Sequence, residues 1–339
     1  MFGAGASYGS CDCNPYPPPL GKDLFPDLLK RGGFATTIEG DVRQRFEENF
    51  EKGMEMFIKT RNVEISTLLR EMSEYFVQFT PGFNNLYRRL ATCLAQRQKD
   101  LGEHVKQRIV FATLNYDLLL ELAILNAGCA VVYPSYIPGN HYTYVSEALR
   151  LRRDILNSYW WANYSATIPT IKTSAFEVLK VHGSCNFLLD IPPENFRGNT
   201  YENVGVAVEA PTIPVLPANK VLDWLRRSDS SLAPSISMYA EGKQVMFSRN
   251  YVQEHQSSFQ TAVKEADRIF LIGVRIWRPD THIWDHIAAS KAWLGYAGGE
   301  PEEFRAWCRE RRHSNHHVLG TYFDDSLPAI EQEIMNITR

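Results

Sequence analysis

The feature that most constrains the fold is the alternation of short apolar runs with longer amphipathic segments along the 339-residue chain. The apolar runs are rich in Val, Ile, Leu and Phe and are bounded by turn residues, which is typical of buried strands. Helical patterns separate most of these runs, so we expect an α/β fold, a doubly wound (Rossmann-like) parallel sheet with helices on both faces. The predicted strands are 108–114, 130–133, 178–182, 268–274 and 317–322.

A long stretch near the start departs from this alternation. Residues 36–105 contain no convincing strand, and their apolar side chains recur at intervals of three and four, the spacing of one helix face. We therefore interpret residues 36–105 as a helical insertion. Its expected helices are 41–59, 63–79 and 86–94.

A second departure follows later in the chain. Residues 191–244 carry six prolines and one short helical pattern, which predicts a loop-rich lobe with a helix at 219–227. We expect residues 1–339 to form a single domain that carries the insertion and the lobe. The other expected helices are 118–125, 251–267, 283–294, 301–312 and 327–337.

Charge and apolar patterning exclude several classes of protein. Thirty-six Lys and Arg against 39 Asp and Glu leave a formal net charge of -3, so no global charge attracts the chain to nucleic acid or to an anionic membrane. The apolar runs are of strand length, far below the roughly 18 residues of a membrane span. Because the first residues resemble no secretory leader and the six cysteines are mostly scattered, we expect a cytoplasmic protein with no membrane partner.

Small residues at the start of the chain form the first candidate binding element. In an open parallel sheet, ligands bind beyond the carboxyl ends of the strands. The run Gly3-Ala4-Gly5-Ala6-Ser7 follows the apolar pair Met1-Phe2. Its glycines would let backbone amides approach a phosphate, and Ser7 can donate one more hydrogen bond. The alternative is a tight glycine turn that holds no ligand.

The segment Thr113-Leu114-Asn115-Tyr116-Asp117 begins at the end of the predicted strand 108–114. The carboxamide of Asn115 can hold a water or a ribose hydroxyl, because it donates and accepts hydrogen bonds at once. The alternative role of Asn115 is to satisfy backbone groups in a turn. Asp117 precedes a helical pattern, so it is also a candidate helix N-cap.

Two later strand ends carry further candidates. His182, Gly183 and Ser184 follow one predicted strand, and an imidazole at such a position suits general-base chemistry because it titrates near neutrality. The alternative is a structural histidine. Gly273 lies at the end of another predicted strand, where the missing side chain would let a sugar or a base lie against the backbone.

These four segments, in this order, resemble motifs of the sirtuin family, and more closely its prokaryotic NAD-hydrolysing branch from antiviral defence. The glycine run at residues 3–7 is similar to the GAGxS turn of the family, residues 113–117 to its T-x-N-x-D element and residues 182–183 to its catalytic His-Gly pair. Gly273 resembles the late glycine that contacts the adenosine ribose. Residues 18–25, which include Asp23, resemble the loop that folds over the cofactor in the defence branch.

The resemblance implies an NAD glycohydrolase that uses NAD as its substrate and depletes it as a defence effector. Asn115 would position water and the nicotinamide-side ribose, and His182 would act as the base. No metal is expected, because the paired cysteines of zinc-dependent deacylases are missing. Arg275 replaces a small hydroxyl residue of the family, which leaves the preference for NAD or NADP open. The implied cofactor-binding residues are Gly3, Ala4, Gly5, Ser7, Asp23, Asp117, Gly183, Ser184 and Gly273.

Two alternatives belong to other functional classes. The first is a non-catalytic module that binds NAD or an ADP-ribose derivative. The second is a metallohydrolase built on His282 and His286, whose spacing puts both imidazoles on one helix face beside Asp280 and Asp285. We regard Asp280 more simply as the residue that opens this helix. Histidines and arginines between residues 309 and 317 form a basic cluster that suits a solvated helix end or a nucleic-acid contact.

The expected partners also follow from the resemblance. It suggests a homo-oligomer, with a separately encoded ATPase or nucleic-acid-sensing protein as a further partner. The helical insertion and the aromatic cluster at residues 159–164 are the expected contact surfaces, since exposed aromatic side chains are common at interfaces.

Overall fold

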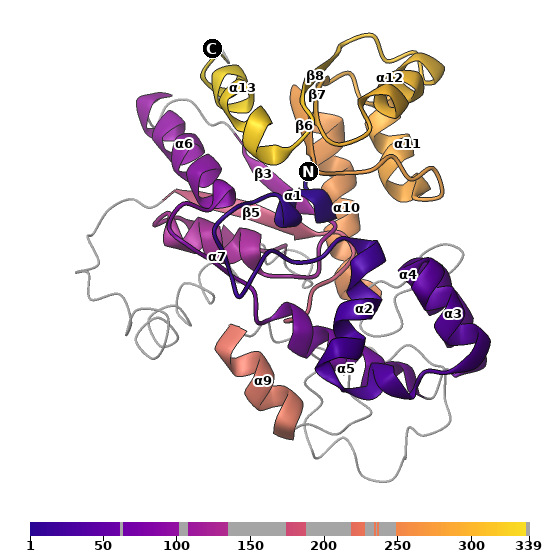
Figure 1. The fold of residues 1–339 in the computed structure, drawn as a ribbon. Coiled ribbons are helices and arrows are strands. Elements are labelled where there is room, and N and C mark those ends of the chain that lie inside the picture. The colour runs from indigo at the N-terminus through magenta and orange to yellow at the C-terminus, as the bar shows by residue number, and fades with distance from the viewer. Residues whose placement is uncertain are drawn as a thin grey trace.

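The computed structural model describes residues 1–61, 64–101, 108–134, 174–187, 218–227, 234, 236 and 249–336. Its described part is a mixed α/β structure with parallel sheets, as the alternating pattern predicts (Figure 1). The aromatic cluster expected at residues 159–164 lies outside the described residues, as does most of the lobe expected at 191–244. Within that lobe, the predicted short helix is present as α9 (Ala218–Arg227).

One half of the structure is built on three parallel strands. They are β3 (Val110–Thr113), β4 (Ala130–Val132) and β5 (Ala175–Lys180), in the order β3-β5-β4. The register sets Thr113 opposite Lys180 at the carboxyl end of the β3–β5 pair. The other half contains β6 (Arg268–Ile272), β7 (Trp293–Ala297) and β8 (His316–Gly320), parallel and in that order.

Phe2 joins the two halves through its backbone. It forms parallel bridges to Thr113 on one side and to Ile272 on the other. The Phe2 amide donates to the Ala112 carbonyl at 2.8 Å, and the amide of Gly3 donates to the carbonyl of Ile272 at 3.1 Å. The strands therefore follow one another as β4-β5-β3-Phe2-β6-β7-β8, with the start of the chain in the middle (Figure 1).

Helices account for most of the remaining described residues. Figure 1 shows α2–α5 grouped together, away from α11, α12 and the strands β6–β8, with α1 between these groups. Helix α10 packs against β5 and α11, and α13 packs against α6 and β8. The bounds are α1 (Ala4–Tyr8), α2 (Gly21–Arg31), α3 (Gly40–Glu48), α4 (Phe50–Thr60), α5 (Ile65–Phe76), α6 (Leu86–Leu101), α7 (Leu119–Asn126), α10 (Arg249–Glu265), α11 (Thr281–Ala289), α12 (Pro301–Glu310) and α13 (Phe323–Met335).

The segment interpreted as a helical insertion is mainly helical. It contains the second half of the turn η1 (Phe34–Thr37) and the helices α3 to α6, with the two-residue strand β2 (Thr80–Pro81) paired to β1 (Cys13–Asn14). The helix expected over 41–59 is two helices, because Asn49 leaves the helical conformation and its side chain accepts from the Lys52 amide at 3.0 Å. Such an N-cap starts a new helix. A stacked pair of rings, Phe25 and Phe46, packs between α2 and α3.

Two further sequence-based assignments were wrong. The helix expected over 283–294 ends at Ala289, and the following apolar run forms the strand β7 between β6 and β8. A buried strand of a parallel sheet is apolar on both faces, so its sequence is easily taken for a helix end. Residues 21–25 of the expected loop at 18–25 are the first turns of helix α2.

No helix in the described ranges is long and apolar enough to cross a membrane.

The backbone is closely packed where the glycine turn at residues 3–7 meets the end of β6. Gly273, directly after β6, has a φ of 60°, and a Cβ there would lie 2.0 Å from the Ala6 amide nitrogen. The Gly5 amide donates to the Gly273 carbonyl at 3.0 Å. The two segments can therefore pack this closely only because Gly3, Gly5 and Gly273 have no side chains.

We predict that Gly273→Ala is strongly destabilising. Gly128 is a matched control, since its φ is 74° and a Cβ there would meet nothing within 4 Å. Gly128→Ala should cost about 1–2 kcal/mol, the cost of the left-handed conformation alone. Gly273→Ala should cost at least about 2 kcal/mol more, because backbone atoms must also move. Urea unfolding measures both variants, and equal losses would contradict the packing role of Gly273.

Candidate functional site

All four segments singled out in the sequence lie at the carboxyl edge of the strands. Thr113 and Lys180 lie opposite each other on the neighbouring strands β3 and β5. Asn115 lies two residues after Thr113, and His182 lies two residues after Lys180, so the two side chains leave the sheet at the same level. The bridges of Phe2 bring the glycine turn to this level from the other side of β3. Gly273 follows Ile272, the partner of Phe2 on β6. The topology therefore gathers residues separated by up to 270 positions at one edge.

The side chain of Asn115 ties the end of β3 to the glycine turn. Its Nδ2 donates to the Gly3 carbonyl at 2.9 Å and to the Ser7 Oγ at 2.8 Å, and the residue is 9% exposed. Its backbone amide donates to the Thr113 Oγ1 at 3.1 Å. These contacts fix the plane of the carboxamide. They also show that Asn115 satisfies backbone groups, the structural role considered as an alternative.

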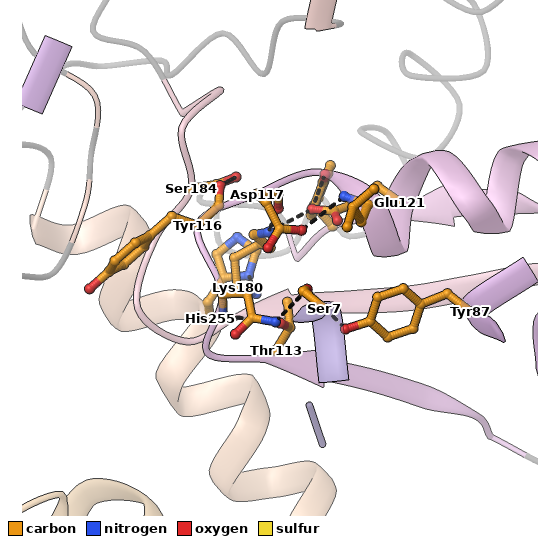
Figure 2. A network of polar contacts seen from close by, with 12 residues as sticks. Ser7, Tyr87, Thr113, Tyr116, Asp117, Glu121, Lys180, Ser184 and His255 are labelled. Atoms are coloured by element: carbon orange, nitrogen blue, oxygen red, sulfur yellow. Dashed lines mark hydrogen bonds and ion pairs between the residues drawn. The ribbon is translucent and has the colours of Figure 1, made fainter. Parts of the chain in front are cut away.

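Ser7 is held from a second direction by Tyr87 of α6. The Ser7 Oγ lies 3.1 Å from the hydroxyl of Tyr87, and both residues are buried (Figure 2). Burial raises the pKa of Tyr87 well above its ordinary value, so the phenol stays neutral. The sequence analysis missed Tyr87, whose position 80 residues after Ser7 carries no local signal.

A group of buried charges supports the neighbouring segment. Lys180 at the end of β5 is fully buried; its Nζ donates to the Asp117 carbonyl at 2.6 Å and lies 3.0 Å from the Glu121 Oε1 (Figure 2). The Tyr133 hydroxyl also donates to the Glu121 Oε1, at 3.2 Å. A buried charge requires such partners, because removal from water costs several kcal/mol per ion. The sequence analysis singled out neither Lys180 nor Glu121.

Asp117 has two structural contacts at the start of α7. Its Oδ1 accepts from the amide of Leu119, the first residue of α7, at 3.0 Å, but the N-cap position belongs to Leu118, so the N-cap expected at Asp117 was placed one residue too early. Burial raises the pKa of the Asp117 carboxyl, and the positive charge of Lys180 opposes this rise. Asp117 therefore belongs to the charge group of Lys180 as well as to the helix start.

The imidazole of His182 faces the beginning of α11. Its Nε2 lies 4.0 Å from the Asp280 Oδ2, and both residues are 4% exposed. The ring centroid of His282 lies 5.5 Å from that of His182. Asp280 is the N-cap residue of α11, but its side chain makes no capping bond. The expectation that Asp280 opens the helix is confirmed for its position, but its carboxylate does not cap the helix.

The residues after His182 form a tight, buried turn. Gly183 has a φ of 78°, which favours glycine, and its amide donates to the Lys180 carbonyl at 3.0 Å. The Ser184 Oγ lies 3.5 Å from the carbonyl of Tyr116. The hydroxyl of Ser73 in α5 donates to the Cys185 carbonyl. Helix α5 of the expected insertion thus contacts the segment that carries His182.

Two of the expected binding residues, and Arg275 as well, are exposed or lie apart from this cluster. Ala4 is exposed in the first turn of α1. Asp23 is exposed in the first turn of α2, and no contact in the described ranges joins it to Asn115 or His182. Arg275 is largely exposed, with its Nε 3.4 Å from the Glu300 Oε2 and its guanidinium 5.9 Å from the Trp277 ring.

The two other candidate sites have less support. Asp285 pairs with Arg311 at 2.9 Å, and within the described ranges no group of three or more His, Cys, Asp and Glu is arranged to hold a metal ion. This pair also occupies one arginine of the basic cluster. Arg278, on the neighbouring surface, pairs with Glu310 at 2.7 Å. These ion pairs reduce the positive field that a nucleic-acid contact would need.

The comparisons with known proteins add no family. No protein-family model matches the sequence, and no curated protein matches it significantly. The case for a function therefore depends on the residues and their geometry.

A buried histidine beneath the site generates a pH prediction. The Nδ1 of His255 in α10 accepts from the Lys180 amide at 3.0 Å. Burial, together with the charge of Lys180, lowers the pKa of His255 to about 3. In the unfolded chain a histidine titrates near pH 6.5. As pH falls through the interval between these pKa values, only the unfolded chain takes up this proton, so the free energy of unfolding decreases.

We predict that His255→Asn removes this pH dependence, since its amide oxygen can still accept from Lys180. Between pH 6.5 and pH 4, the wild type should lose about 3 kcal/mol more stability than the variant. Urea unfolding at several pH values measures the difference. Parallel stability curves for the two proteins would mean that His255 takes up its proton normally when folded.

Proposed function

We propose that this chain is an NAD glycohydrolase that cleaves NAD to nicotinamide and ADP-ribose, as an NAD-depleting effector similar to the sirtuin-like proteins of antiviral defence. The observation that carries the proposal is the contact of Asn115 with the glycine turn, beside a histidine that leaves the neighbouring strand at the same level. This combination joins an oriented carboxamide, a candidate base and a small-residue turn at one sheet edge.

The strand order supports a doubly wound, Rossmann-like fold for this function. From Phe2 the chain fills one side of the sheet with β3, β4 and β5 and then fills the other with β6, β7 and β8. In such sheets, the strand order reverses beside the strand from which the chain builds first one half and then the other. A crevice lies at the carboxyl edge at this point, and nucleotides bind there. Here that crevice would be bordered by Gly3, directly after Phe2, by Gly273, directly after its partner Ile272, and by Asn115, two residues after its partner Thr113.

The chemistry of NAD cleavage requires what these residues can provide. Water adds to C1′ of the nicotinamide-side ribose while the bond from C1′ to the ring nitrogen breaks, and that electron pair neutralises the pyridinium. The water gives up one proton, which His182 would accept. The oxocarbenium-like transition state depends on orientation of water and ribose, as in glycoside hydrolysis. Asn115 would supply that orientation.

The other residues would hold the rest of the dinucleotide. Gly3, Gly5 and Ser7 belong to the turn that Asn115 fixes. The amides of Gly3 and Gly5 already donate to the carbonyls of Ile272 and Gly273, so these glycines would let the dinucleotide approach the backbone without donating to it. Gly183 and Ser184 continue from His182. Gly273 keeps the strand end open beside the turn. Asp117 would act through the loop that it caps, while Ala4 and Asp23 depend on the family resemblance alone.

One observation favours a second candidate, a module that binds NAD or an ADP-ribose derivative without cleaving it. Both hydrogens of the Asn115 Nδ2 have protein acceptors, so the carboxamide already performs a structural task. The arginine at position 275 is also large and exposed where the family carries a small hydroxyl residue. A binding module would need the turn and the crevice but no base.

We predict that Asn115→Ala and His182→Ala both remove NAD hydrolysis while the protein stays folded. His182→Ala should lower the rate by about 10²- to 10⁴-fold, the usual contribution of a positioned acid or base. Asn115→Ala should also cost about 1 kcal/mol of stability through the lost hydrogen bonds to the turn. The measurement is nicotinamide release from NAD, with circular dichroism to check folding.

His317→Ala is the control, because that imidazole is exposed on β8. It should hydrolyse NAD like the wild type. A wild type that binds NAD but releases no nicotinamide would support the binding module instead. Full turnover by a folded Asn115→Ala protein would refute the role of Asn115.

Self-association is a further part of the proposal. An unrestrained NAD hydrolase would drain the NAD pool of its own cell, so we expect assembly with itself or with a separately encoded ATPase or nucleic-acid sensor to control it. Keeping the competent state near 1% needs a difference of only about 2.7 kcal/mol, which one interface can supply. Light scattering and NAD turnover over a dilution series test this. A monomer with full, concentration-independent activity would contradict it.

A further inference from the structure

We propose that Asp280 is a positioning residue for His182: its carboxylate faces the imidazole and stabilises the proton that His182 accepts. The inference rests on the proposed function, because it assigns a role to Asp280 in the same reaction. It adds a residue from α11, the helix that follows Gly273, to a site otherwise built on the glycine turn and the ends of β3 and β5.

The geometry of the Asp280 side chain points toward His182 and away from helix capping. The Asp280 carbonyl begins α11 by accepting from the amides of Ile283 and Trp284, at 2.9 and 3.0 Å. The carboxylate makes no bond to the helix N-terminus, although aspartate at this position usually does. Its Oδ2 lies instead 4.0 Å from the His182 Nε2, and both side chains are buried.

This placement selects one form of the imidazole. A carboxylate beside Nε2 favours the tautomer with its hydrogen on that nitrogen, so Nδ1 is the basic atom. After His182 takes the proton of the attacking water, both ring nitrogens carry hydrogen and the ring is positive. Asp280 then faces an imidazolium across 4.0 Å in a buried setting, where opposite charges interact strongly.

Among the residues that the structure describes, other ionisable groups also lie around His182. The His282 ring packs against it from α11, and Lys180 lies two residues before it in the chain. Tyr116 comes from the neighbouring loop; burial raises its pKa, and the charges of Glu51 and Asp280 raise it further, so it stays neutral. Within the described part of the chain, the structure pairs the carboxylate of Asp280 with the His182 ring.

Asp280→Asn tests the proposal in the full chain, because asparagine keeps the size of the side chain and removes its charge. We expect kcat for NAD hydrolysis to fall about 10- to 100-fold with KM changed less than twofold. The acid limb of the pH–rate profile should move to lower pH by about one unit, since the imidazolium loses its counter-charge. Asp280→Glu should recover part of kcat.

Asp285→Asn is the matched control. Asp285 lies on the same helix but is exposed and pairs with Arg311, so its loss should leave kcat and the pH profile as in the wild type. A folded Asp280→Asn protein with unchanged kcat and pH profile would overturn the proposal. So would an Asp285→Asn protein with the same losses as Asp280→Asn, because the effect would then be general to the helix.

Nitrogen-15 NMR of the histidine side chains gives a readout that needs no activity, with His182→Ala identifying the signal. We expect the wild-type ring to carry its hydrogen on Nε2 and its pKa to fall in Asp280→Asn. A hydrogen on Nδ1 would overturn the pairing, even if the Asp280 variants fail to fold. A wild type that releases no nicotinamide refutes the proposed function, whereas these spectra still decide the pairing, so the two failures are distinguishable.

Discussion

The parallel pairing of Phe2 with β3 and β6 is the constraint on which the rest of the structure depends. Phe2 exchanges backbone hydrogen bonds with β3 and the residue after β3, while its neighbours Met1 and Gly3 exchange them with Ile272 of β6, and so the two three-stranded halves are joined. Its ring is buried between Phe111 and Tyr87, which anchors the bridge in the core. Because Phe2 is followed at once by the glycine turn, this pairing also determines where Gly3 to Ser7 lie relative to Asn115 and Gly273.

The glycines of the site have a physical reason that is independent of any ligand. Side chains at Gly3 or Gly273 would collide with backbone atoms of the facing segment, so the crossing itself demands glycine. The stronger indication of function is the polar environment. Lys180, Glu121, Asp117 and Asn115 are buried together at a strand edge, where apolar residues would pack at lower cost in desolvation.

Periodicity predicted much of the fold, because burial of one face or of whole strands leaves a local pattern. Strands β3, β4, β5, β6 and β8 and the helical character of residues 41–94 were expected, whereas α1 and α2 were not and β7 was taken for a helix end. The strand-end rule also located Asn115 and His182. It could not find Tyr87 or Lys180, since their contacts with Ser7 and Glu121 join distant parts of the chain. Asp280 was taken for a cap because sequence shows the position of a carboxylate and not its direction.

The environment of His182 distinguishes the two functional candidates more sharply than that of Asn115. Asn115 orders the glycine turn, and both a hydrolase and a binding module would need that turn. A binding module gains nothing from a buried imidazole next to a buried carboxylate, since each is costly to remove from water. A hydrolase does gain, because its base must hold a new positive charge during the reaction. The contact between His182 and Asp280 therefore gives the catalytic interpretation its physical advantage.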